Sequence, residues 1–223
     1  MRSRAMHMHF HKKSWWAAGA VALFLAGCSN LPSPPQALVR YDLGAAPALV
    51  AASAPSQPIA LAQIQAPLQV EGSTGLRYRL AYADAQELRT YAQARWSLQP
   101  AQMVQQRLRE HLSQGGRVVL SAQPGELPPL VHGRSVPVLS LSLEEFSQVF
   151  SSTRDSVGWV RIRATLVDSA PRGDVLLAQQ VFEVRQPAGA ANAAGGVQAL
   201  SQAVDAVGGQ LQQWLQQAVP AKP

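Results

Sequence analysis

The chain has 223 residues, 47% of them hydrophobic, with 19 basic and 13 acidic residues and a formal net charge of +6. The length suffices for one domain with a sizeable core. Such a basic balance can indicate nucleic-acid binding. However, four basic residues and no acidic ones lie within residues 1–27, so the rest of the chain has 15 basic against 13 acidic residues. We therefore expect no nucleic-acid partner.

The start of the chain has the organisation of an export signal. A positively charged segment precedes about 11 apolar residues over positions 15–25, within the range of such signals. A membrane-spanning helix would need roughly 20 apolar residues. The run closes with Leu25-Ala26-Gly27-Cys28, in which small residues precede the only cysteine of the chain.

This ending resembles a bacterial lipobox. It predicts cleavage between Gly27 and Cys28 and a covalent lipid on the Cys28 thiol, with no other cofactor. An ordinary secretory cleavage site and a buried structural thiol are the two alternatives. The sequence thus divides into a signal peptide (1–27), a proline-rich flexible tether (28–38) and a folded domain (39–219).

The domain opens with strand signals. Residues 39–43 and 59–65 are short β-branched or aromatic runs, and an Ala/Pro-rich loop over 44–58 separates them. Residues 76–82 alternate in polarity, and residues 87–96 suggest another strand, although their alanine content leaves a helix as the alternative. The alternation predicts one buried face that holds Leu76, Tyr78, Leu80 and Tyr82.

A helix is predicted to begin near Pro100 and to end at Gly115-Gly116. Its apolar stripe consists of Val104, Leu108 and Leu112, and Leu98 and Ala101 extend the stripe backwards. A short strand over 117–120 follows.

Three longer strands, over residues 136–150, 157–167 and 174–185, are expected to pair antiparallel as a meander. Phe146 and Phe150 are out of phase with the leucines before them, so we expect a β-bulge at Glu144-Glu145. These two adjacent carboxylates should face opposite sides of the sheet.

The strand over 157–167 separates its residues into two faces. Val160, Ile162, Ala164 and Leu166 point inward, whereas Trp159, Arg161 and Arg163 point outward. The outward three are candidate contacts for a partner, and an ordinary solvated face is the alternative.

The chain closes with an amphipathic helix of about six turns. Gly208-Gly209 should weaken its middle by roughly 1 kcal/mol per glycine and allow a bend. Its stripe consists of Val197, Leu200, Val204, Val207, Leu211, Trp214 and Ala218. The predicted fold class is α+β: a mainly antiparallel sheet with one mid-chain helix and a C-terminal amphipathic helix packed on it.

Catalytic patterns are absent from the sequence. His111 and His132 have no Cys or carboxylate at metal-ligand spacing, so we predict surface or capping roles for both and no metal site. We find neither a nucleophile elbow nor a glycine-rich phosphate loop. The protein is therefore expected not to be an enzyme.

Several short motifs together resemble the ABC-type transport auxiliary lipoproteins, a group that includes the paraquat-inducible protein C lipoproteins. They are the lipobox at Cys28, Tyr41-Asp42-Leu43, the strand over 76–82, Arg95-Trp96 before the helix at Pro100, and the hairpin from Leu139 to Phe150. The chain departs from that pattern in its longer Ala/Pro loop after Leu43, which leaves the register of the first strands open.

The resemblance implies an accessory role in lipid transport between the inner and outer membranes. Partners would be a mammalian-cell-entry (MCE) domain protein with its ABC permease and ATPase, the membrane through the lipid anchor, and further copies of the chain in a ring. Ser29 follows Cys28 where many inner-membrane lipoproteins of this kind have Asp, so we expect the periplasmic face of the outer membrane. A lipid-binding carrier of the LolB type and an assembly lipoprotein of another outer-membrane machine are the alternatives.

Overall fold

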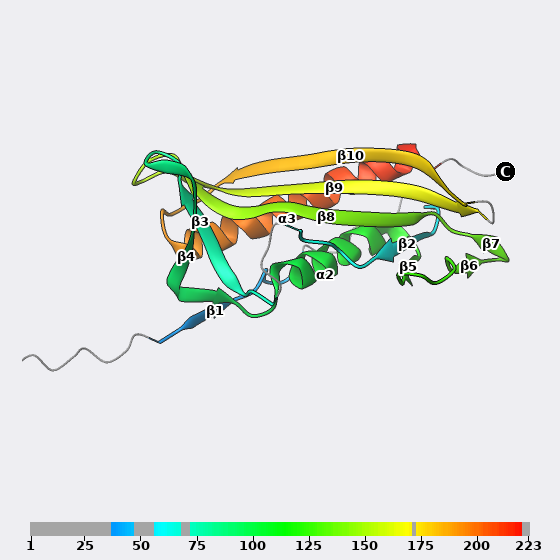
Figure 1. Cartoon of the computed structure of the whole chain (residues 1–223), viewed down its shortest axis with the longest axis horizontal. Coiled ribbons are helices and arrows are strands. Elements are labelled where there is room, and N and C mark those ends of the chain that lie inside the picture. The colour runs from blue at the N-terminus through cyan, green and yellow to red at the C-terminus, as the bar shows by residue number, and fades with distance from the viewer. Residues whose placement is uncertain (1–36, 47–55, 68–71, 171–172, 220–223) are drawn as a thin grey trace, which may run out of the picture. The chain divides into compact units, whose positions relative to one another are not determined.

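The computed structural model describes residues 37–46, 56–67, 72–170 and 173–219. Within these residues the chain forms ten strands and two α-helices, which confirms the predicted α+β class (Figure 1). The helices are α2 (Pro100–Ser113), which a short 3₁₀ turn (Gln114–Gly116) follows, and α3 (Ala193–Ala218). The strands are β1 (Val39–Tyr41), β2 (Ile59–Ala62), β3 (Gly75–Leu80), β4 (Asp84–Trp96), β5 (Val119–Ala122), β6 (Leu130–Val131), β7 (Arg134–Ser135), β8 (Val138–Phe150), β9 (Ser156–Ala170) and β10 (Gly173–Pro187).

The meander β8-β9-β10 is the longest part of the sheet, and its strands pair antiparallel as predicted (Figure 1). The inward residues of β9 are also confirmed, because Val160, Ile162, Ala164 and Leu166 have no exposed surface. The predicted bulge lies where expected: the register of β8 against β9 shifts between Leu143 and Glu145. The shift returns Phe146 to the core side, opposite Val160.

One edge of β8 is shared by two strands, a feature that the sequence did not predict. β2 pairs parallel with the start of β8 at Val138–Leu139, and β3 pairs parallel with its end at Gln148–Phe150. Between them, Gln65 bridges to β8: its N–H donates to Leu141 at 2.9 Å, and its carbonyl accepts from Leu143 at 2.7 Å. The sheet therefore forks, with β2 and β5 on one branch and β3, β4 and β1 on the other.

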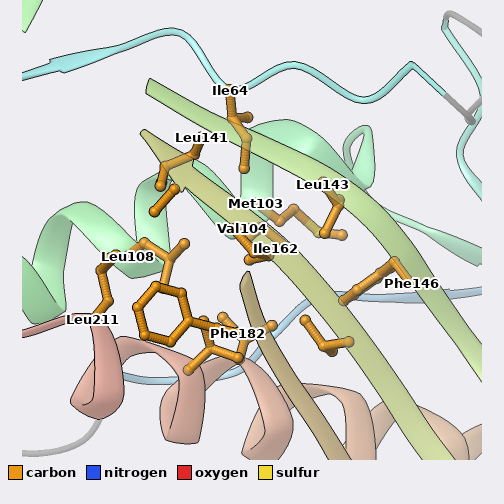
Figure 2. Close-up of a cluster of buried hydrophobic side chains, with 14 of the residues drawn as sticks. Ile64, Met103, Val104, Leu108, Leu141, Leu143, Phe146, Ile162, Phe182 and Leu211 are labelled. Carbon is orange, nitrogen blue, oxygen red and sulfur yellow. The ribbon is translucent and has the colours of Figure 1, made fainter. Parts of the chain in front are cut away.

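Both helices enclose one core. α3 packs against β8, β9 and β10, and α2 packs against α3. Figure 2 shows side chains from helices and strands pointing toward one another, among them Leu108 of α2, Leu211 of α3 and Phe182 of β10. The predicted stripe of α2 is confirmed, since Val104, Leu108 and Leu112 are fully buried. The stripe of α3 is buried from Val197 to Leu211, and Leu215 joins it.

The two glycines in the middle of α3 do not interrupt the helix, which is continuous over 193–218. Gly208 is buried against α2: a Cβ added there would lie 2.6 Å from Cγ of His111. At Gly209 a Cβ would meet nothing within 4 Å. Gly208 thus allows the close approach of the helices.

Two predicted core residues are exposed. Tyr82 is 48% exposed because β3 ends at Leu80, where a turn begins in which Ala83 N–H donates to the Leu80 carbonyl at 2.9 Å. Leu98 is 50% exposed because it precedes the helix, which begins only at Pro100, so the helical spacing does not apply to it. Most of the predicted loop over 44–58 lies outside the described residues.

Candidate interaction face

The candidate contact residues Trp159, Arg161 and Arg163 lie on the outer face of β9, opposite the core. Both arginine side chains are only partly exposed, at 39% and 40%, because acidic neighbours on the flanking strands hold them. The prediction that all three share one outward face therefore agrees with the structure, and their role in partner binding stays a prediction.

Glu144 of β8 is the centre of this arrangement. Its two carboxylate oxygens accept from Nε of Arg161 at 2.8 Å and from Nε of Arg163 at 2.7 Å. Burial alone would raise the pKa of Glu144, but the hydrogen bonds and charges of the two arginines outweigh it, so its pKa is lowered. Glu144 therefore carries its negative charge throughout the neutral range.

Carboxylates also pair with arginines on the neighbouring strands. Glu183 of β10 lies 3.3 Å from Nη1 of Arg161 and 3.1 Å from Nε of Arg185. The Arg185 guanidinium stacks over the Trp159 ring, 4.3 Å from its centroid. On β3, Arg79 lies 3.2 Å from Glu145. We call the set Arg79, Glu144, Glu145, Arg161, Arg163, Glu183 and Arg185 the outer ion-pair network.

The expected separation of Glu144 and Glu145 onto opposite faces is wrong. Both carboxylates bind arginines of the outer face. The reason is the bulge between Leu143 and Glu145, which places two consecutive residues on one side of the strand. Each carboxylate is neutralised by a guanidinium, so the pair has the character of a fixed, nearly neutral surface rather than of an acid-base site.

The predicted surface role of His111 is also wrong. The side chain is 8% exposed, and its Nε2 lies 2.8 Å from Oδ1 of Asp205 in α3. Arg107 Nε lies 3.2 Å from the same oxygen, and a second Arg107 nitrogen donates to the Leu43 carbonyl. This cluster joins α2 to α3 and to the segment after β1. His132, in contrast, is exposed in the turn between β6 and β7.

Other kinds of site find no support in the described part of the chain. None of its His, Cys, Asp and Glu side chains gather in a group of three that could hold a metal ion. Neither helix there combines the length and apolar character that a membrane span requires. Gly27 and Cys28 lie outside the described residues, so the predicted cleavage and lipid anchor stay predictions.

Solved structures share this fold. A protein from Xanthomonas campestris, described as a DUF330 family member, has a TM-score of 0.63 at 19% identity, and the match covers 81% of this chain and 95% of that one. A second, uncharacterized protein has a TM-score of 0.58 at 13% identity, with 81% and 99% covered. At these identities the likeness concerns the fold alone.

The family of the chain is identified from its sequence. The model of the ABC-type transport auxiliary lipoprotein component family matches residues 41–212, from β1 to the last third of α3, and the chain belongs to that family. The resemblance inferred from the motifs is thereby confirmed, and the family is one of auxiliary transport components. Among curated proteins, none matches the chain.

Proposed function

We propose that this protein is an accessory lipoprotein of an MCE/ABC-type intermembrane lipid transport system, anchored on the periplasmic face of the outer membrane through a lipid on Cys28. It acts by docking to an MCE-domain protein and its ABC permease and ATPase, as a ring of copies, and it is not an enzyme. The observation that carries the proposal is membership of the auxiliary lipoprotein family over residues 41–212. The leader that ends in Leu25-Ala26-Gly27-Cys28 supports the anchor.

The outer ion-pair network supports docking as the mode of action. Its arginines are held in one orientation by two carboxylates of β8 and one of β10, and Trp159 is held under Arg185. Trp and Arg are the residues most often found at the energetic centres of protein interfaces. Because their side chains are already ordered, docking on this face costs less conformational entropy than docking on a mobile surface.

Copurification from detergent-solubilised membranes tests the proposal. The tagged full chain should recover the MCE-domain protein and the ABC components. Trp159→Ala and Arg163→Gln should each reduce that recovery several-fold. Arg154→Gln is the matched control, because Arg154 is an exposed arginine in the β8–β9 turn, outside the network. If the unaltered chain recovers no MCE or ABC component and deletion of its gene leaves lipid trafficking intact, the proposal fails.

Membrane fractionation tests the anchor separately. Cys28→Ser should prevent lipidation and processing, and Ser29→Asp should move the protein to the inner-membrane fraction. An unchanged outer-membrane location for both variants would contradict the proposed anchoring.

A lipid carrier of the LolB type is less well supported. Such a carrier would need an apolar cavity for acyl chains within its core, whereas the core of this protein is filled with side chains packed against one another (Figure 2).

A further inference from the structure

β2, β5 and the β6–β7 hairpin gather at the end of the sheet opposite β1 (Figure 1). The side chains there line a hollow. Its volume is about 380 Å³, within the range of small-molecule sites. Its wall comes from the residues just before β2 and β5, the hairpin and the two residues after it, the end of β9, Leu177 of β10 and Val219 after α3. None of these residues belongs to the outer ion-pair network.

The lining is mostly apolar, and it continues into apolar surface at the mouth. Val136 on the wall is 2% exposed, whereas Val118, also on the wall, is 49% exposed. Next to the hollow, Leu130 of β6 is 65% exposed, and it pairs with the lining residue Ser135. Large apolar side chains left open around a concave apolar site indicate a ligand with apolar surface of its own.

The β6–β7 hairpin forms a wall that can adapt to an occupant. Each of its strands has two residues, and within the described residues they pair only with each other. The turn between them places His132 at φ 50° and Gly133 at φ 74°, the left-handed pair that a two-residue hairpin requires. So short a ribbon has little stability of its own, and its position depends on what it packs against.

Charged groups of both signs stand beside the apolar lining. Arg134 of β7 and Asp168 of β9 belong to the wall, as does His132 of the turn. An occupant that is apolar along one part and polar or charged at one end matches this wall. A purely apolar protein side chain would contact only the apolar lining and leave the charged groups without a ligand. A nucleotide would leave the apolar lining without a ligand.

We infer that this hollow binds one aliphatic chain of a lipid, with the methylenes against Val118, Val136 and Leu177 and the polar end toward Arg134 and Asp168. The inference rests on the proposed function and extends it, because it gives the accessory protein a lipid contact of its own. It is independent of the outer face, so either can hold without the other.

Photocrosslinking with the full chain in lipid vesicles tests the inference. The probe is a phospholipid with a diazirine within one acyl chain, and labelled peptides are identified by mass spectrometry. Labelling is expected on the peptides that contain Val118, Val136 and Leu177, and excess unlabelled phospholipid should suppress it. A probe with the diazirine on its headgroup should label the peptide around His132 and Arg134 instead.

Val118→Trp should place an indole in the mouth and reduce acyl-probe labelling at least five-fold. Leu88→Trp is the matched control, because Leu88 is 39% exposed on β4 and is not part of the wall. Labelling of the unaltered chain that avoids these peptides, or labelling that Val118→Trp leaves unchanged, overturns the inference. Labelling sites on the unaltered chain decide the matter even if Val118→Trp folds poorly. Recovery of the MCE and ABC components, measured in parallel, reports on the proposed function separately.

Discussion

Gly208 and Gly209 offer a sharp test of how α2 and α3 pack. Replacing either glycine with alanine should gain up to about 1 kcal/mol of helix propensity. At Gly209 the new methyl group meets open space, so the gain should appear in full as added stability. At Gly208 the new Cβ would lie 2.6 Å from Cγ and 2.7 Å from Cδ2 of His111, closer than real contacts allow. Either the His111 side chain or the helices must then shift, and overpacking of this kind costs typically about 1–3 kcal/mol.

The two variants should therefore differ in unfolding free energy by about 1–3 kcal/mol, with Gly208→Ala the less stable. At roughly 2–4 °C per kcal/mol for a domain of this size, their midpoints should lie roughly 2–12 °C apart. Thermal and urea unfolding, followed by circular dichroism, measure the difference.

A double-mutant cycle identifies the cause. In a His111→Ala background the two contacts with the ring disappear and only the contact with Cβ of residue 111, at 3.0 Å, remains. Gly208→Ala should then lose most of its penalty relative to Gly209→Ala, with a coupling energy of about 1–3 kcal/mol. The reasoning is refuted if Gly208→Ala alone matches Gly209→Ala in stability, or if His111→Ala leaves their difference unchanged.

Three further outcomes are expected. Leu211→Ala should lower the free energy of unfolding, measured in urea, by about 2–5 kcal/mol, because Leu211 is fully buried. Leu176→Ala, at a 61% exposed position, should change it by less than about 0.5 kcal/mol. Equal losses in the two variants would contradict the assigned core. Because the folded-state pKa of Glu144 is lowered, its stabilising contribution is present at neutral pH and is lost as the pH falls below about 4.5, the ordinary value. Glu144→Gln should then lose less stability than the unaltered protein between about pH 5 and 3, and parallel losses in acid titrations would count against the network. Burial, and then the charge of Tyr78, raise the pKa of Tyr91 to about 12, so its contribution is present below about pH 10 and is lost as the pH rises through 12; Tyr91→Phe should flatten the alkaline decline in unfolding midpoint.

The meander was predictable from sequence because its signals are local. Alternation over 157–167 separates Val160 and Ile162 from Arg161 and Arg163, and the hairpin turns bring neighbouring strands together. Even the bulge near Glu144 could be predicted, because Phe146 had to return to the core. Its effect on Glu144 and Glu145 was missed, since the simple alternation rule does not hold at the bulge itself.

Contacts between distant segments were not predictable. The fork on β8 depends on β2 and β3, and parallel pairing leaves no turn signal that would identify the partner. His111 lies next to a core residue in sequence, so its burial depends on where α3 crosses α2. Its partner Asp205 is 94 residues away in sequence. The need for a glycine at position 208 likewise arises only where α3 packs against His111 of α2. The carboxylates that hold Arg161 and Arg163 likewise come from two other strands.

If the protein is anchored as proposed, β1 is the element that would carry a mechanical load into the domain. It is three residues long and lies parallel to β4, with Tyr41 beside Trp96, and it directly follows the predicted tether. A pull along the proposed tether would therefore enter the domain through these three paired residues. Two further hydrogen bonds hold the chain just after β1. Ser97 N–H donates to the Tyr41 carbonyl at 2.7 Å, and the Arg107 side chain donates to the Leu43 carbonyl. A load along the strand strains its hydrogen bonds together rather than one at a time, and forced unfolding depends on the rate at which they yield. Under the proposed anchoring, the pairing of β1 with β4 would therefore be the first part of the domain to resist such a load, before the meander does.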